Sequence, residues 1–266
     1  MIGLLHYGSF ALYGIAGALL GVSLAREARR LTAVATFVVA LGLVVHAIGL
    51  FEYASIFGQL PLAGFGPSLS TLAFLIGIGC LIAATLGHAS TVGLILVPLV
   101  ALLTVVAAIV GISPTPSIGG WIVLHVLFAF LGYVGLTVSF AAGLMYLIQF
   151  RELKSKHFGA IFRFFPPLDT LDRLGHRGLI VGFPFLTLAL ALAWGWTSNS
   201  GGETLESSKL AWVVLSWVVF LLALLARLGK GRRAERGALA SVIGFVVVVV
   251  LYVVLRANAS QVGTFL

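Results

Sequence analysis

Long apolar runs, separated by short segments that are charged or rich in Gly, Pro and Ser, divide the whole chain. Each run matches the roughly 20 apolar residues that a helix needs to cross a bilayer. The pattern predicts an all-α polytopic transmembrane bundle of about eight spans. We expect them over residues 4–25, 31–53, 69–88, 91–112, 120–150, 177–197, 208–227 and 237–256.

Composition supports this prediction. Apolar residues make up 61% of the 266 positions and charged residues only 9%, whereas soluble domains carry roughly 25% charged residues. We expect one transmembrane domain over residues 1–266. The single cysteine, Cys80, excludes an intramolecular disulfide framework. The first apolar run lacks a basic residue before it and a convincing cleavage site, so we expect it to remain as the first span.

The distribution of Lys and Arg predicts the orientation. Fourteen of the sixteen fall in loops on one side of the predicted bundle, and only Lys209 and Arg256 fall on the other. Because basic loops stay in the cytoplasm, both termini are expected outside, in a bacterial-type inner (plasma) membrane. The positive charge then meets anionic lipid head groups, and we expect no nucleic-acid binding.

The longest cytoplasmic loop, residues 152–177, mixes phenylalanines with basic residues. This mixture is typical of a short helix on the membrane surface. Pro166 and Pro167 are expected to end it, and Asp169 to cap a turn that leads into the sixth span.

Three of the six histidines are candidates for chemistry. His88, His157 and His176 fall at or in cytoplasmic loops, whereas His6, His46 and His125 lie toward the outer side. At 1.5 Å per residue, His46 and His125 lie roughly 7 to 11 Å inside the outer boundary. Similar depth suits two axial ligands of one haem, and His6 is a third candidate. The structural alternative is that each histidine only hydrogen-bonds a neighbouring helix.

Helical spacing places each histidine on a stripe of small or polar residues. Such stripes mark the faces where membrane helices approach one another, so the three imidazoles are expected to point into the bundle. The stripes are Gly42, His46, Gly49 and Tyr53; His125, Gly132, Ser139 and Gly143; and His6, Tyr13 and Gly17.

Other residues at the outer surface could complete such a site. Lys209 and Arg256 could pair with haem propionates, although Lys209 could equally balance Glu203 and Glu206. Trp194 and Trp196 could stack on a porphyrin or serve as interfacial anchors.

Several segments resemble the cytochrome c assembly superfamily, and within it the eight-span HemX/CcsA-like group. The resemblance is good over about 120–256 and general before that. It is carried by Leu124-His125-Val126, Leu131-Gly132-Tyr133, Met145-Tyr146-Leu147, Pro167-Leu168-Asp169, Leu171-Asp172-Arg173-Leu174 and Gly182-Phe183-Pro184-Phe185-Leu186-Thr187-Leu188. It implies haem handling at the outer face, with cytochrome c maturation or tetrapyrrole-synthesis proteins as partners. The family's histidine at the start of span five falls on His125, and a second-span histidine falls on His46.

The chain also departs from the haem lyases of this group. Their WWD motif corresponds here to the stretch from Trp194 to Gly202, which lacks the aspartate. Residues 256–266 contain no histidine, and Leu222-Ala223-Leu224-Leu225 stands where lyases place one in span seven. A complete lyase is therefore not expected, and whether the chain is an enzyme stays open.

The resulting hypothesis is a membrane protein that binds haem b between spans two and five and handles, traffics or regulates haem. His46 and His125 are the expected iron ligands. Two alternatives stay open. One is a small-molecule transporter or permease with histidines along its pathway, which the nearly featureless spans three, four and eight disfavour. The other is a membrane anchor subunit of a larger complex that docks partners on the basic cytoplasmic surface.

Overall fold

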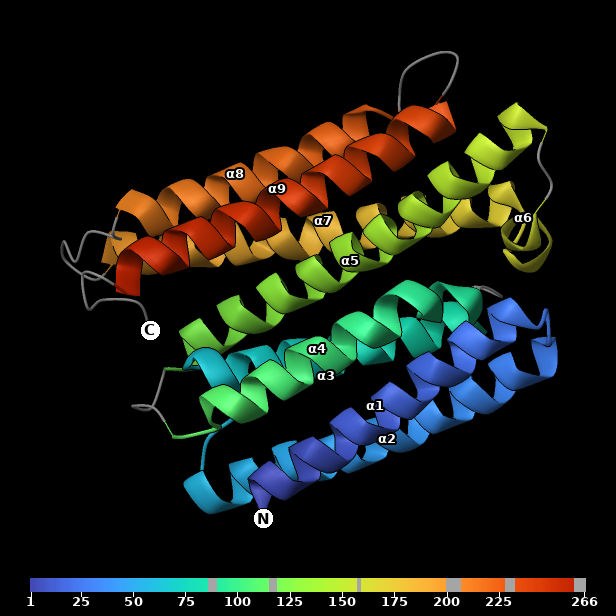
Figure 1. Ribbon diagram of the computed structural model, residues 1–266. Helices are drawn as coiled ribbons and strands as arrows, with labels where there is room; N and C mark the ends of the chain where they lie inside the picture. The colour runs from blue at the N-terminus through green and yellow to red at the C-terminus, as the bar shows by residue number, and fades with distance from the viewer. Residues whose placement is uncertain (86–89, 115–118, 157–158, 200–206, 228–232, 261–266) are drawn as a thin grey trace. The chain divides into compact units, whose positions relative to one another are not determined.

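The computed structural model describes the chain except residues 86–89, 115–118, 157–158, 200–206, 228–232 and 261–266. Every regular element in the described part is helical, which confirms the predicted all-α class (Figure 1). The elements are α1 (Ile2–Ala25), α2 (Arg29–Phe57), α3 (Phe65–Thr85), η1 (Ser90–Val92), α4 (Gly93–Val110), α5 (Gly120–Ser155), α6 (Ala160–Phe164), α7 (Leu168–Asn199), α8 (Ser207–Leu225) and α9 (Arg233–Ser260).

Seven stretches of the described residues are long and apolar enough to cross a membrane. They are Ile2–Ala25, Arg29–Phe57, Phe65–Thr85, Ser90–Val110, Gly120–Ser155, Leu168–Gly195 and Ala234–Tyr252. The chain is therefore a multi-pass membrane protein. The eighth predicted span is α8, whose apolar described part is the shorter Trp212–Leu225.

Several helices extend past the apolar runs that predicted them. The largest difference is α7, which begins at Leu168, nine residues before the predicted start of the sixth span. Pro167 directly precedes it and Asp169 lies in its first turn. A proline beside the first turn and a carboxylate within it both favour a helix start. The end of the predicted loop and the predicted sixth span therefore form one continuous helix.

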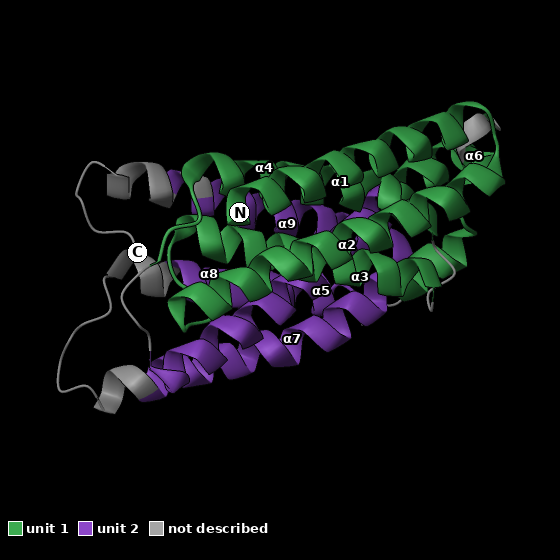
Figure 2. Ribbon diagram, turned by 90° about the horizontal axis from the view of Figure 1, so that it is seen from below, with its two compact units in different colours: residues 1–117, 145–174 green, residues 118–144, 175–266 purple. Residues whose placement is uncertain are grey.

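The chain forms two compact units, coloured separately in Figure 2. Unit 1 comprises residues 1–117 and 145–174, and unit 2 comprises residues 118–144 and 175–266. The boundaries fall inside α5 and α7, so each of these helices belongs to both units.

In unit 1, α1 packs against α2 and α4, and α3 packs against α2 and α4 (Figure 1). Glycines allow close packing where these helices meet. A Cβ atom added at Gly77 in α3 would lie 2.8 Å from Cδ2 of Leu43 in α2.

The short helix α6 also packs within unit 1. It lies in the segment where the sequence predicted a surface helix. Phe164 and Phe165 are buried, and the Arg163 guanidinium pairs with Glu27 at 2.7 Å. Phe164, the last residue of α6, and Phe165, which follows it, are therefore shielded from solvent, whereas the ion pair is exposed.

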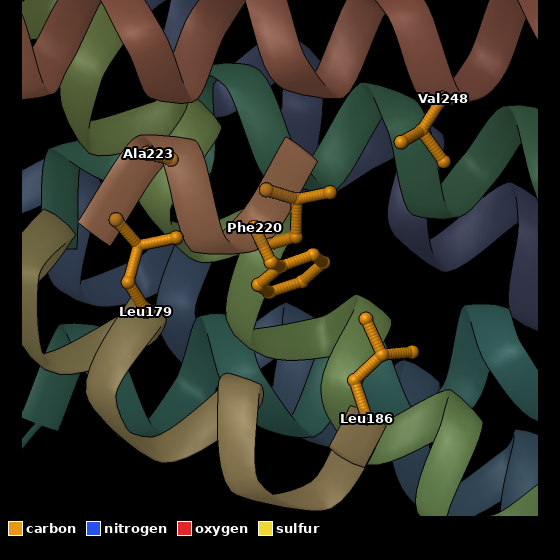
Figure 3. Packing of buried hydrophobic residues seen from close by; sticks show 6 residues of the cluster. Leu179, Leu186, Phe220, Ala223 and Val248 are labelled. Atoms are coloured by element: carbon orange, nitrogen blue, oxygen red, sulfur yellow. The ribbon is translucent and has the colours of Figure 1, made fainter. Parts of the chain in front are cut away.

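In unit 2, α5 and α7 approach so closely that only glycine fits between them. A Cβ added at Gly135 would lie 2.7 Å from the Gly182 Cα atom. Beside this contact lies an apolar cluster, most of which Figure 3 labels: Leu136, Leu179, Leu186, Phe220, Ala223 and Val248. It joins α5, α7, α8 and α9 within the unit.

Candidate functional site

Two of the three singled-out histidines meet in unit 1. His6 of α1 and His46 of α2 are fully buried, and their ring centroids lie 5.1 Å apart in an edge-to-face arrangement. Their Nε2 atoms share one partner, the Ser70 hydroxyl of α3, at 2.7 Å from His6 and 2.9 Å from His46. We call His6 and His46 the buried histidine pair.

The remaining nitrogens of the buried histidine pair are also bonded. His6 Nδ1 lies 2.8 Å from the Ile2 carbonyl oxygen, and His46 Nδ1 lies 3.3 Å from the Tyr13 hydroxyl. The carbonyl can only accept, so a neutral His6 donates from Nδ1 and its Nε2 accepts from Ser70. Since the Ser70 proton is then used, Ser70 accepts from His46 Nε2 and His46 Nδ1 accepts from Tyr13. All four hydrogen bonds therefore run in one direction, from Tyr13 to Ile2.

Glycines on α2 make space for this chain of hydrogen bonds. A Cβ at Gly49 would lie 3.1 Å from His6 Cε1, and one at Gly42 would lie 2.8 Å from a ring carbon of Tyr13. The small-residue stripe around His46 thus receives the ring of His6 and the ring of Tyr13 from α1.

Ser70 is the member of this cluster that sequence reasoning missed. Serine is common at the faces where membrane helices pack, so its identity alone carries little information. The feature that could have indicated Ser70 is its position, five residues after the start of α3. This start follows the predicted outer loop, which places Ser70 at the depth expected of His6 and His46.

His125, in the part of α5 that belongs to unit 2, has a different environment. Its imidazole is half-buried, and Nδ1 lies 2.8 Å from the Ala189 carbonyl oxygen of α7. One turn earlier, Trp121 Nε1 donates to the Leu192 carbonyl at 2.8 Å. These two bonds fix the His125 ring against α7.

The hydrogen bond to Ala189 determines which His125 nitrogen is available. The carbonyl accepts the Nδ1 proton, so Nε2 of neutral His125 carries the lone pair. Among the described residues, Nε2 has no hydrogen-bond partner. Metal-bound histidines usually donate their second ring nitrogen to a carbonyl or carboxylate in this way.

The other predicted site residues are less informative. Trp194 of α7 is 68% exposed. Trp196, Lys209 and Arg256 lie in α7, α8 and α9, but their side chains fall outside the described residues. His6 and His46 belong to unit 1, whereas His125 belongs to unit 2.

Comparison with known families matches nearly the whole chain to one of them. The family described as "Cytochrome C assembly protein" matches residues 4–261. The chain belongs to the cytochrome c assembly protein family. The predicted superfamily is thereby confirmed, and the HemX subgroup remains a prediction.

Among curated relatives, the chain is similar to several proteins named cytochrome c biogenesis protein CcsA. It is 30% identical to that of Chlamydomonas reinhardtii over 129 residues, 48% of this chain and 35% of the relative. It is 30% identical to that of Guillardia theta over 148 residues, 50% of this chain and 49% of the relative. It is 35% identical to that of Gloeothece citriformis over 85 residues, 32% of this chain and 26% of the relative. The matches thus span about half or less of these relatives.

Proposed function

We propose that this protein binds haem through His125 and handles it during cytochrome c assembly. Family membership and the names of the CcsA relatives support a part in cytochrome c assembly. The geometry around His125 supports this residue as the haem ligand. We further propose that the site faces the outside of a bacterial-type inner membrane, as the distribution of basic residues predicts.

The observation that carries the proposal is the hydrogen bond from His125 Nδ1 to the Ala189 carbonyl. It holds the ring against α7 and makes Nε2 the nitrogen with a lone pair. An axial haem ligand needs such a nitrogen. His125 could therefore hold an iron porphyrin, which would supply the iron centre of this function when bound.

The chain's own residues have distinct parts in this function. His125 binds, Ala189 orients the imidazole, and the bond from Trp121 to Leu192 keeps α5 and α7 in register beside it. Two further roles remain predictions from the sequence. Stacking on the porphyrin is predicted for Trp194 and Trp196, and pairing with the propionates is predicted for Lys209 and Arg256.

His46 and His6 also remain predicted haem ligands. In the buried histidine pair, Ser70 Oγ lies within 3 Å of both Nε2 atoms. Either histidine would therefore have to release Ser70 before it bound iron through Nε2. His125 has no equivalent obstacle among the described residues.

The test is a visible absorption spectrum of the protein purified in detergent from cells supplied with a haem precursor. Wild type is expected to show the Soret and α/β bands of a histidine-ligated haem. His125→Gly should lose or shift these bands, and added imidazole should restore them because it supplies the missing nitrogen.

His176→Ala is the matched control. His176 is a histidine of the same unit, and its buried Nδ1 has no hydrogen-bond partner among the described residues. This variant should keep the wild-type spectrum. Unchanged bands in His125→Gly, or wild-type protein that never carries haem, would overturn the proposal. His46→Ala and His6→Ala, measured alongside, test the other two predicted ligands.

A further inference from the structure

Three arginines are grouped where α1 joins α2. Arg26 follows the last residue of α1, and Arg29 and Arg30 are the first two residues of α2. All three are exposed, and none forms an ion pair with a described residue. The carboxylate between them, Glu27, is already paired with Arg163 at 2.7 Å. We call these three residues the arginine turn, and their positive charge is not neutralised within the described part of unit 1.

Hydrogen bonds on two sides hold the backbone of the arginine turn. The Ser23 hydroxyl donates to the Ala28 carbonyl at 3.0 Å. Since its proton is then used, the Thr32 hydroxyl donates to Ser23 at 2.7 Å. On the other side, Arg29 donates to the Arg163 carbonyl of α6 at 3.2 Å, next to the end of α1 (Figure 1). A segment that is already held in place loses little backbone entropy when it binds a ligand.

An apolar strip on α2 begins one helical turn after Arg30. Val34, Phe37 and Leu41 follow Arg30 at intervals of four, three and four residues, which is the spacing of one helix face. Their side chains are 49%, 70% and 44% exposed. Because α2 is long and apolar enough to span a membrane, these exposed apolar side chains face lipid acyl chains. The arginine turn therefore lies directly beside a surface that suits an acyl chain.

This combination selects the class of ligand. Guanidinium groups bind phosphate oxygens through charge-assisted hydrogen bonds, and basic residues at the end of a span lie near the lipid head groups. A soluble phosphate would use only the arginines, whereas a phospholipid uses the arginines and the apolar strip together. We propose that the arginine turn and the apolar strip form a binding site for one anionic phospholipid. Its phosphate lies against the arginines, and one acyl chain lies along the strip.

Such a site differs from the general attraction of basic loops to anionic lipid. Arg151 and Lys154, near the end of α5, are exposed basic residues of the same unit. The apolar side chains one helical turn before them, Leu147 and Phe150, are partly buried. General attraction would treat the two pairs of basic residues alike, whereas the proposed site depends on the arginine turn.

Native mass spectrometry of the purified full-length protein tests the proposal. The protein is released from mixed micelles that contain phosphatidylglycerol and phosphatidylcholine with the same acyl chains. Wild type is expected to retain one phosphatidylglycerol per chain in preference to phosphatidylcholine. The double variant Arg26→Gln with Arg30→Gln keeps Arg29 and its bond to α6. It should bind phosphatidylglycerol about tenfold more weakly, because each basic residue near the surface adds to the attraction.

Arg151→Gln with Lys154→Gln is the matched control, since it removes two exposed positive charges from the same unit. This variant should retain phosphatidylglycerol as wild type does. An equal loss in both double variants, or wild type without a preference for the anionic lipid, would overturn the proposal. Excess inorganic phosphate should leave the lipid bound. Displacement by phosphate would show that the apolar strip contributes nothing and would contradict a lipid ligand.

Photo-crosslinking of wild type keeps the test valid if the arginine variants fail to fold. Phosphatidylglycerol with a diazirine in its acyl chain should label peptides from the apolar strip more strongly than phosphatidylcholine with the same diazirine does. Equal labelling of the strip by the two probes would contradict the proposal. The site does not include His125, so the arginine variants should keep the haem spectrum of wild type, and the two proposals can fail separately.

Discussion

The Gly49 backbone in α2 lies directly against the imidazole of His6 in α1. A Cβ at position 49 would approach His6 Cε1 to 3.1 Å and Nδ1 to 3.3 Å. The ring cannot retreat without lengthening its bonds to Ile2 and Ser70, which are 2.8 Å and 2.7 Å long. The absence of a side chain at position 49 is thus part of what positions the buried histidine pair.

Gly49→Ala is therefore expected to destabilise the protein by about 1 to 3 kcal/mol, the usual cost of overpacking a filled interior. Thermal unfolding in detergent measures this. Gly14→Ala is the control, since a Cβ at Gly14 meets nothing within 4 Å. Equal melting temperatures for the two variants would show that the His6 ring can move away from the added methyl group at little cost.

Gly135→Ala should have a larger effect in unit 2. Its Cβ would meet backbone atoms of α7, including Gly182 Cα at 2.7 Å, and backbone cannot rotate away as a side chain can. We expect the variant to be recovered at low yield, or to lose its folded state at a much lower temperature. Gly195→Ala, whose nearest atom is the Trp121 ring at 3.5 Å, should be tolerated. A stable, fully expressed Gly135→Ala protein would contradict the described approach of α5 to α7.

The attachment of α6 depends more on apolar burial than on charge. Arg163 and Glu27 form an ion pair whose side chains are 63% and 43% exposed, and such pairs contribute at most about 1 kcal/mol. Phe164 is only 4% exposed, and truncating a buried phenylalanine costs about 3 kcal/mol. Limited proteolysis of the segment around α6 should therefore accelerate much more in Phe164→Ala than in Arg163→Ala. The reverse order would mean that charge holds the helix.

Orientation in the membrane can be tested with reporter fusions. The distribution of basic residues predicts that the turn between α1 and α2 lies in the cytoplasm and the loop between α2 and α3 outside. Alkaline phosphatase fused after Glu27 should be inactive, and the same enzyme fused after Gln59 should be active. The opposite pattern would invert the topology and place the proposed haem site at the cytoplasmic face.

Most helices could be predicted because a transmembrane span needs a long apolar run, and such runs are visible in the sequence. Their ends were less predictable. Arg29, Leu168 and Ser155 lie in helices although they fall outside the apolar runs, because water-exposed helical turns need no apolar residues. Helical spacing also showed correctly that His6 and His46 point inward.

The partners of these histidines were not predictable. The hydrogen bonds of Ser70 depend on how α3 packs against α1 and α2, and no periodicity within α3 encodes that arrangement. The Ala189 carbonyl that orients His125 is a backbone atom, so no residue type could have indicated it. Predicting either site needs the helix crossings as well as the spans.

The passage of α5 and α7 between the two units has a consequence for biosynthesis. Residues 145–174 complete unit 1, yet they are translated after residues 118–144, which belong to unit 2. Unit 1 can therefore be completed only after the fifth membrane helix and α6 have been synthesised. Because synthesis of unit 2 starts before unit 1 is complete, the two units cannot fold strictly one after the other during translation.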